Sequence, residues 1–508
     1  MKSGHHQTRK NRKTIKPLNN SNNTATKNNK RESKNKTRFS HGRESKTRFS
    51  HKGICGSILE SKEGWKTICV YGDPYDRGFA HGYLLREEFR RVLKILPFVV
   101  KTMLKVSMTE YMKKSNELIK PVIQEKYPEF FKEIEGISDG LKAGGIRATS
   151  DFIIAWNSYM TLYSVFLDGS IENQNDQKSM VERCSAFIAT GSATKDGKIV
   201  MGHTTHSDFA TASLFNIIMY VVPMQGHPFV MQTSPGYIAS VSDWFISTSG
   251  IIGCETTISS INYKPEFGTP FFCRIRQAMQ YANTLDQYVE IMLHENAGDY
   301  ACSWQFGDIN SNEIMLFEIG LKTHAIQRTK DGIFYGMNSA IDKNLRTLET
   351  DDKDFDDITK STGARNLRLN YLLNEKYNGR IDAKVAQLIL SDHYDVFENK
   401  VEMNTRSICR HTELDPTPTK RPGYYPFGCT DAKVTTADMA RQMSFMGRFG
   451  SACGRDFNVK KYIRDHPIFK EWQPFLTDFP KTAWHKLHLS TFLMRNGVRI
   501  KRKGLHSV

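Results

Sequence analysis

The sequence predicts a mixed α+β domain that follows a disordered, basic N-terminal tail. Residues 53–167 show the apolar periodicity of helices, short apolar runs after Cys184 indicate β-strands, and helical patterns return after about residue 355. Hydrophobic residues make up 39% of the 508 residues, which is enough to build a large buried core.

The positive charge of the chain is concentrated in the tail. Residues 1–52 hold 16 Lys and Arg against two acidic residues, Glu32 and Glu44, so they carry +14 of the total +17. The segment is almost without apolar residues, and it cannot offset the entropy lost on ordering. We therefore expect disorder. Two interpretations stay open: an arm for localisation or weak polyanion binding, and a solvated extension.

Residues 53–167 are expected to form a mostly helical segment. A strand at 68–71 and a turn at 72–78 precede a helix from Phe79 to Leu96, which should end before Pro97. The apolar spacing predicts a second helix over 127–142. The polar run 168–183 suggests an exposed loop, which is suited to be a processing linker because chain cleavage needs accessible backbone. A catalytic core over 184–495 would pack with 53–167 as one domain.

The stretch after Cys184 is predicted to be rich in strands. The expected strands lie at 185–190, 198–203, 214–222, 228–233, 244–253, 313–319 and 332–337. Asp196-Gly197 is a two-residue turn signal between the first two strands. If these two residues form the loop, Cys184 lies opposite Phe209. The second strand then brings His203, Thr205, His206 and Asp208 close to Cys184.

Cys184 is the candidate nucleophile. It opens the run Cys184-Ser185-Ala186-Phe187 at the start of the first strand of this stretch. A cysteine flanked by small residues at the head of a strand is typical of N-terminal-nucleophile hydrolases, in which the chain cuts itself before the cysteine. The α-amine that is set free then acts as the general base for the thiol. The alternative is a buried structural cysteine.

Other residues are candidates for supporting roles. Asn296, in a turn before a strand, could donate to a tetrahedral oxyanion, or it could simply form the turn. Arg365 could bind a substrate carboxylate or phosphate. His203, His206 and Asp208 could tune the amine or bind substrate, or they could be satisfied polar residues at a strand end.

Composition argues against several classes of protein. The N-terminus lacks the apolar segment of a secretory signal, and no run of about 20 apolar residues is present, so we expect an intracellular protein without a transmembrane segment. The nine cysteines are scattered without CxxC pairs, which argues against a disulfide framework and against a zinc site. We expect no cofactor and no metal.

Several segments, taken in order, resemble the N-terminal-nucleophile hydrolases that include the isopenicillin-N acyltransferase-like hydrolases and the phospholipase B-like proteins. The resemblance runs from about 65 to 485. It is carried by Arg77-Gly78-Phe79-Ala80-His81-Gly82, Cys184-Ser185-Ala186-Phe187, Asp196 to His203, Ser234-Pro235-Gly236, Glu255-Thr256-Thr257, Asn296-Ala297-Gly298-Asp299-Tyr300, Ser303-Trp304, Ala364-Arg365, Asp392-His393-Tyr394-Asp395 and Cys409-Arg410-His411.

The resemblance implies an αββα sandwich, in which two antiparallel sheets lie between helical layers. It also implies autocatalytic cleavage of the Arg183–Cys184 bond and activity on an acyl amide or ester through a thioester on Cys184. Asn296 would help to form the oxyanion hole, with His203, Thr205 and Asp208 lining the site. Arg365, Glu255 and Thr256 would bind the substrate.

Two other functions stay open at this point. The first is a phospholipase B-like enzyme, which would cleave lipid acyl esters with the same nucleophile. The second is a non-catalytic binding or structural protein, in which the basic tail holds nucleic acid and the rest of the chain is a scaffold without activity.

Overall fold

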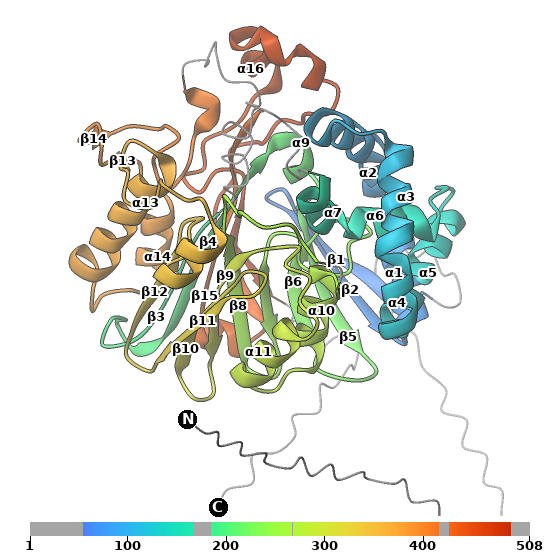
Figure 1. The fold of residues 1–508 in the computed structure, drawn as a ribbon, viewed down its shortest axis with the longest axis horizontal. Helices are drawn as coiled ribbons and strands as arrows, with labels where there is room; N and C mark the ends of the chain where they lie inside the picture. Colours follow the sequence, from blue (N-terminus) through green and yellow to red (C-terminus); the bar gives the residue numbers. More distant parts are fainter. Residues whose placement is uncertain (1–53, 167–183, 267, 416–425, 489–508) are drawn as a thin grey trace, which may run out of the picture. The chain divides into compact units, whose positions relative to one another are not determined.

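Two β-sheets pack face to face and helices cover their outer sides (Figure 1). The computed structural model describes residues 54–166, 184–266, 268–415 and 426–488, all within the unit Lys52–Val508. The expected tail and processing linker lie outside the described residues. The predicted αββα sandwich is confirmed.

The larger sheet has nine strands. In spatial order they are β1 (Gly56–Lys62), β2 (Trp65–Gly72), β5 (Ile217–Pro223), β6 (Phe229–Thr233), β7 (Trp244–Ser247), β8 (Ile251–Thr257), β9 (Cys302–Asp308), β10 (Glu313–Ile319) and β11 (His324–Thr329). β2 and β5 run parallel, whereas the other neighbours in this sheet are antiparallel. The parallel pair departs from the purely antiparallel sheets that we expected.

The smaller sheet has six strands and carries Cys184. In spatial order they are β12 (Gly332–Gly336), β3 (Cys184–Gly191), β4 (Gly197–Asp208), β15 (Phe427–Thr436), β16 (Ser444–Phe449) and β17 (His485–His488). β13 (Tyr394–Asp395) and β14 (Lys400–Val401) form a separate two-stranded sheet. β3 contacts β8, β9 and β10 of the larger sheet, so one face of β3 is buried between the sheets.

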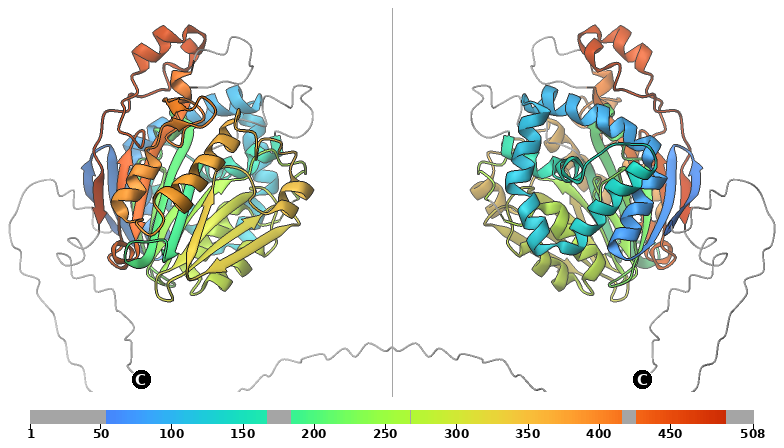
Figure 2. Two further views of the ribbon diagram at one scale, coloured as in Figure 1. Left: turned by 90° about the vertical axis from the view of Figure 1, so that its left-hand side faces the viewer. Right: turned by 90° about the vertical axis from the view of Figure 1, so that its right-hand side faces the viewer.

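Helices form the two outer layers (Figures 1 and 2). α14 contacts β4 and β15, whereas α1, α10 and α11 contact strands of the larger sheet. The α-helices are α1 (Pro74–Leu84), α2 (Arg86–Val99), α3 (Met108–Leu118), α4 (Lys120–Lys126), α5 (Pro128–Ala143), α6 (Ser150–Asn157), α7 (Tyr159–Phe166), α9 (Phe209–Ala212), α10 (Phe271–Tyr281), α11 (Leu285–Leu293), α12 (Lys343–Glu349), α13 (Ser361–Asn370), α14 (Ala383–Leu390), α15 (Ala437–Arg441) and α16 (Val459–Asp465). The π-helical segments are η1 (Val100–Leu104) and η3 (Tyr371–Lys376), and the 3₁₀ segments are η4 (Thr412–Leu414) and η5 (Pro467–Trp472).

Alternation along β3 and β4 sorts their apolar side chains into two cores. Ile188 and Met201 belong to the core that continues into the larger sheet, while Phe187 and Val200 belong to the core beneath α13 and α14. Successive side chains of a strand point to opposite faces, so both faces of this sheet must be covered. Polar residues on the inner face are therefore buried between the sheets.

The predicted helix boundaries before residue 143 are partly wrong. The helix expected over 127–142 is confirmed as α5, but the one expected to begin at Phe79 begins at Pro74, where Asp73 caps it by accepting a hydrogen bond from the Asp76 amide at 3.0 Å. The helical path also does not end before Pro97. α2 includes Pro97 and leads directly into η1, although Pro97 cannot donate a backbone hydrogen bond.

The predicted register of β3 against β4 is also wrong. Cys184 pairs with Thr205, not with Phe209, because the connection spans 192–196 and Gly197 already belongs to β4. A bulge between Ala189 and Gly191 changes the pairing by one residue. The strand expected over 244–253 is likewise two strands, β7 and β8, separated by a turn at Gly250 with φ of 97°.

The Arg77-Gly78-x-x-x-Gly82 element packs α1 tightly against α5. A Cβ atom on Gly78 would lie 2.0 Å from the Glu133 carbonyl oxygen, and one on Gly136 would lie 2.2 Å from the Tyr75 carbonyl oxygen. Arg77 forms a buried ion pair with Glu133 at 2.7 Å. The glycines thus permit an approach of the two helix backbones that any side chain would prevent.

The same element also holds the Ser234-Pro235-Gly236 turn. The Gly236 amide donates to His81 Nε2 at 2.8 Å, and Trp156 Nε1 donates to the Pro235 carbonyl at 3.0 Å. Two of the segments that carry the family resemblance therefore meet in the structure, between α1 and the end of β6.

Candidate active site around Cys184

Cys184 is the first residue of β3 and its side chain faces the space between the sheets. Its residue is only 2% exposed. Its backbone amide donates to Asn338 Oδ1 at 3.2 Å, and its carbonyl accepts from Arg365 Nη1 at 2.7 Å. The backbone of Cys184 is thus held by hydrogen bonds at both its amide and its carbonyl. Arg183, the other half of the expected cleavage site, lies outside the described residues.

Arg365 organises the backbone around Cys184. It lies on α13, is fully buried, and donates to Ser185 Oγ at 3.1 Å and to Asn338 Oδ1 at 3.0 Å. Charge-assisted hydrogen bonds of this kind are strong and directional. These contacts hold the backbone of Cys184 and the side chain of Asn338 together. Contact of Arg365 with a substrate stays a prediction.

A buried ion pair lies on the same face of the sheet as Cys184. The register places Thr205 and Asp431 in one row with Cys184, and His203 and Lys433 in the next row. Lys433 Nζ donates to Thr205 Oγ1 at 2.9 Å and to Asp431 Oδ1 at 2.6 Å.

The larger sheet completes this network. Gln232 Nε2, on β6, donates to Asp431 Oδ2 at 2.8 Å. The two sheets are therefore joined by hydrogen bonds close to Cys184. Lys433 and Asp431 are both fully buried, and their mutual attraction offsets the cost of removing two charges from water.

His203 is a neutral imidazole held by the backbone of β8. Its Nε2 donates to the Glu255 carbonyl at 2.9 Å, so its Nδ1 is the unprotonated nitrogen, and this atom is buried without a hydrogen-bond partner. Burial, followed by the charge of Lys433, holds the pKa of His203 well below its usual value.

His206 and Asp208 do not join this group. His206 Nε2 contacts the Ile408 carbonyl and Thr204 Oγ1, both at 3.2 Å, on the opposite face of the sheet. Asp208 ends β4 and caps α9 by accepting from the Thr211 amide at 2.7 Å. Neither residue shows a hydrogen bond to Cys184. A two-residue hairpin loop would have placed His206 and Asp208 beside Cys184. The register of β3 against β4 is different, and Cys184 pairs with Thr205 instead.

Glu255 and Thr256 lie on β8, which contacts the strand that Cys184 begins. The Glu255 carboxylate accepts from the Tyr300 hydroxyl at 2.8 Å, and the same hydroxyl lies 2.5 Å from Thr257 Oγ1. The Glu255-Thr256-Thr257 segment and the segment that ends at Tyr300 therefore meet. The Thr256 hydroxyl is buried without a hydrogen-bond partner, beside Gly336 of β12. A substrate-binding role for either residue stays a prediction.

Asn296 is used elsewhere. Its Nδ2 donates to the carbonyls of Gly320 at 2.7 Å and Leu321 at 3.1 Å, and its Oδ1 accepts from the Gly298 amide at 3.0 Å. Both protons of its amide group are thus engaged in fixing a turn, and its described hydrogen bonds do not reach Cys184. The turn-forming interpretation fits these contacts.

Sequence reasoning missed three polar residues at the site. Asp431 and Lys433 are two residues apart in β15, with Ala432 between them and Val434 after them. Two charges at this spacing inside a strand share one face, so the sequence did contain a signal for a buried ion pair. Asn338 follows β12 with φ of 80°, and only the tolerance of Asn for this conformation could have suggested it. Its Nδ2 donates to the Thr257 carbonyl at 3.1 Å, which joins β8 to the amide of Cys184.

The surroundings keep the Cys184 thiol protonated. Burial, and then the negative charges of Glu255 and Asp243, raise the pKa of Cys184 well above its usual value, while Lys433 opposes this shift. The thiolate is the nucleophilic form. The thiol therefore needs a base close by before it can attack a carbonyl.

No side chain of this site belongs to a group that could hold a metal ion. Among the described residues, one such group is found elsewhere, at His393, Cys409, His411 and Cys453. In the same part of the chain, no helix combines the length and the apolar character that crossing a membrane requires.

The chain is similar to phospholipase B proteins. The phospholipase B family profile matches residues 75–324, which confirms the predicted resemblance. An Archaeoglobus fulgidus protein is 26% identical over 255 residues, which cover 48% of this chain and 41% of that protein. Putative phospholipase B-like 3 of Caenorhabditis elegans is 27% identical over 134 residues, which cover 24% of this chain and 23% of that protein. The matches thus span less than half of these relatives' lengths.

Two crystal structures of conjugated bile acid hydrolase from Clostridium perfringens are also similar, each with a TM-score of 0.30. One, a mutant, is 10% identical, with 52% of this chain and 89% of that chain covered. The other, a variant, is 9% identical, with 60% and 97% covered. The assignment of the fold rests on the sheets and helices described above.

Proposed function

We propose that this chain, which is related to the phospholipase B family over residues 75–324, is a cysteine acyl hydrolase that matures by cleaving its own Arg183–Cys184 bond. One observation carries the proposal. Cys184 begins β3 with its amide bound by Asn338 and its carbonyl bound by Arg365, beside a row of buried polar side chains. A structural cysteine in an apolar core needs none of these contacts.

Cleavage would proceed by attack of the Cys184 Sγ on the carbonyl carbon of Arg183. The peptide C–N bond breaks, a thioester between Arg183 and Sγ forms, and the thiol proton passes to the leaving nitrogen. Water then hydrolyses the thioester to give the Arg183 carboxylate and the Cys184 thiol. The new α-amine stands where the amide nitrogen stood, 3.2 Å from Asn338 Oδ1.

The mature site would use this amine as its base. The amine takes the proton of the adjacent thiol, and the thiolate attacks the acyl carbonyl of the substrate. A thioester forms on Cys184, the amine returns a proton to the leaving group, and water releases the acid. Lys433 favours the thiolate, because its positive charge lowers the pKa of Cys184 against the opposing effect of burial.

The oxyanion donor is reassigned in this proposal. Asn296 was the predicted donor, but both of its amide protons bind carbonyls of a turn. The Asn338 amide lies beside Cys184 and shows one proton engaged, by the Thr257 carbonyl. We place Asn338 at the oxyanion, with its second amide proton toward the substrate.

The first experiment measures maturation. Purified full-length protein is analysed by intact mass and denaturing gel. We expect fragments of 183 and 325 residues, since 508 − 183 = 325. Cys184→Ala should remain one chain, while Cys69→Ala, a buried cysteine on β2, should split like the wild type. A wild type that never splits, with Cys184→Ala indistinguishable from it, would contradict maturation.

The second experiment separates the substrate classes. The family match favours lipid acyl esters. Split wild type and Cys184→Ala are therefore assayed on phospholipids, on lysophospholipids and on N-acyl amides. Release of fatty acid from the esters, abolished in Cys184→Ala, supports a phospholipase B-like activity. Release from amides alone points to an amidase. No turnover of any acyl substrate favours a binding protein.

A further inference from the structure

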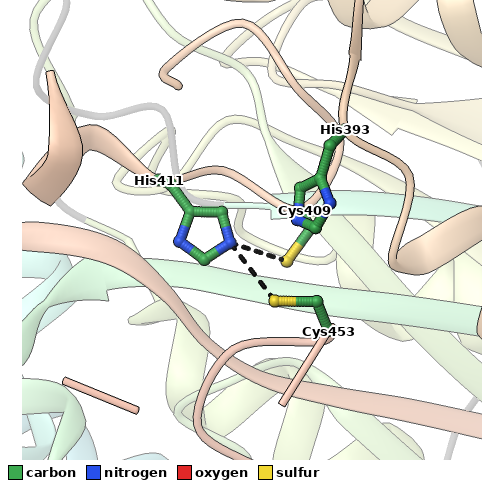
Figure 3. Close-up of side chains that lie close together, drawn as sticks. All are labelled: His393, Cys409, His411 and Cys453. Atoms are coloured by element: carbon green, nitrogen blue, oxygen red, sulfur yellow. Dashed lines mark hydrogen bonds between the residues drawn. The ribbon is translucent and has the colours of Figure 1, made fainter. Parts of the chain in front are cut away.

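A second cluster, of thiol and imidazole side chains, lies outside the hydrogen-bond network around Cys184. His393 stands between α14 and β13, Cys409 and His411 lie just before η4, and Cys453 follows β16 (Figure 3). One ligand atom from each of these four residues lies within 4.8 Å of the other three. Cys409 and Cys453 pack with the core beneath α13 and α14.

The distances within the cluster fit tetrahedral zinc. His411 Nε2 lies 3.4 Å from Cys409 Sγ and also 3.4 Å from Cys453 Sγ, as the dashed lines in Figure 3 show. In a tetrahedral site, Zn–S bonds of about 2.3 Å and Zn–N bonds of about 2.0–2.1 Å place neighbouring sulfur and nitrogen ligands about 3.5 Å apart. The imidazole and the two sulfurs therefore already stand at ligand spacing.

The other nitrogen of His411 has the partner that a metal ligand requires. His411 Nδ1 donates to the Glu413 carboxylate at 2.7 Å, which leaves Nε2 to face the sulfurs. Histidines that bind zinc usually give their second N–H to a carboxylate or a carbonyl, which fixes the tautomer and the ring orientation. Glu413 supplies such a carboxylate.

His393 provides a second indication. Its Nε2 is buried without a hydrogen-bond partner. Burying a polar atom without a partner is costly, and a metal bond at this nitrogen would remove that cost. The loop that carries His393 is anchored independently of any metal, because the His393 carbonyl accepts from the Glu402 amide at 2.9 Å and the Asp392 carbonyl accepts from the Cys409 amide at 3.1 Å.

A third thiol close by is already engaged. Cys429, on β15, accepts from the Ala452 amide at 3.4 Å and lies 3.7 Å from the Asp431 carbonyl, to which its S–H points. Without Cys429, the cluster contains four groups that could bind a metal ion, namely two thiols and two imidazoles. This is the donor set of a closed structural site, and it leaves no position for a substrate.

We infer that His393, Cys409, His411 and Cys453 bind one structural Zn²⁺ ion. Two thiolates balance its charge, so binding releases the thiol protons and weakens as the pH falls. The ion would join the 391–415 segment, which contains β13, β14 and η4, to the residues that follow β16. Ile408 of this segment contacts His206 of β4 through its carbonyl. Zinc would thus brace the outer face of the sheet that carries Cys184. The inference does not depend on the proposed function.

Metal content of the purified full-length protein tests the inference. Elemental analysis should give one zinc per chain. Cys409→Ser and Cys453→Ser should each lose it, while Cys55→Ser, at a partly exposed cysteine outside the cluster, should keep it. Protein refilled with Co²⁺ should show the visible absorption bands of tetrahedral thiolate-bound cobalt, and these bands should be absent in Cys453→Ser.

A variant outside the ligand set guards against loss of folding. Glu413→Gln leaves the four ligands in place but weakens the partner of His411. It should lower zinc affinity by about 10- to 100-fold, measured by competition with a chelator. Wild-type protein that binds neither zinc nor cobalt, or that holds a Cys409–Cys453 disulfide, would overturn the inference. So would full zinc content in both Ser variants.

Discussion

At the scale of single residues, the site depends on charges that are buried but paired. Lys433 and Asp431 form a fully buried ion pair, and Thr205 and Gln232 complete their hydrogen bonds. An unpaired charge in this position would be strongly unfavourable, so the pair must form together with the contact between the sheets. The positive charge of the same lysine lowers the pKa of Cys184, against the effect of burial.

Protonation of His81 should make the free energy of unfolding depend on pH. Burial lowers its pKa from 6.5 to about 4, and its Nε2 accepts from the Gly236 amide. The folded-state pKa lies below the unfolded value, so the neutral imidazole contributes stability that is present above pH 6.5. This contribution is lost as the pH falls toward 4, and it amounts to about 3 kcal/mol.

Urea unfolding of the wild type between pH 7 and pH 4 should show this loss. In His81→Gln, an amide oxygen can replace Nε2 as acceptor without titrating, and the pH dependence over this window should be smaller by about the same amount. His324→Gln, at an exposed histidine, serves as the matched control. Identical slopes in wild type and His81→Gln would contradict the assignment.

At the scale of elements, close backbone contacts explain why certain glycines are needed. Gly78 and Gly82 of α1 face Gly136 and Gly140 of α5, and a Cβ atom on any of the four would lie within 2.0 to 2.2 Å of a carbonyl oxygen of the other helix. Figure 2 shows these helices in the layer beside β1 and β2. The Arg77-Gly78-x-x-x-Gly82 element, which resembles the family, thus allows α1 to pack closely against α5 in this structure.

Gly136→Ala should destabilise the protein. Helix propensity alone favours Ala over Gly by about 1 kcal/mol, so a net loss isolates the steric clash. Overpacking of this kind costs about 1–3 kcal/mol, which a lower midpoint of urea unfolding would report. Gly145→Asn is the control, because no atom lies within 4 Å of a Cβ there and Asn tolerates the local φ of 80°. A stabilised Gly136→Ala protein would argue against the close packing.

At the scale of the whole described unit, the segment before Cys184 is part of the fold. β1 and β2 belong to the larger sheet, and β2 pairs in parallel with β5, which follows Cys184 in the chain. α1 contacts β5 as well. Cleavage before Cys184 would leave two chains that share one sheet and one core.

The two fragments should therefore stay together after cleavage. Under native conditions we expect both in a single peak on size-exclusion chromatography, and only denaturant should separate them. Pairing over seven residues between β2 and β5, with both strands largely buried, is the physical reason. Spontaneous separation of the fragments in buffer would show that this contact does not hold the unit together.

Residue patterns by themselves predicted the α+β class, the helix α5, Cys184 at the head of β3, and the strands β2 to β8, β10 and β12, with β7 and β8 as one. They missed β15, β16 and β17, which lie in the stretch after residue 355 that was expected to be helical. The predicted features depend on local periodicity and turn chemistry, which neighbours in the chain determine. The offset of β3 against β4 was wrong by four residues, because a longer connection and a bulge cannot be told from a tight turn without the paired strand.

Tertiary structure alone decided which polar groups meet. Asn338 and Arg365 bind the backbone of Cys184, and the charge of Lys433 lowers its pKa, although the three residues come from separate segments. The donor set of the inferred zinc site also comes from three segments, with no CxxC spacing to reveal it. The sequence by itself determined the elements with clear local periodicity and the place of Cys184 at the head of a strand. Long-range packing decided their partners, because contacts between distant residues depend on how the sheets stack and not on the order of residues along the chain.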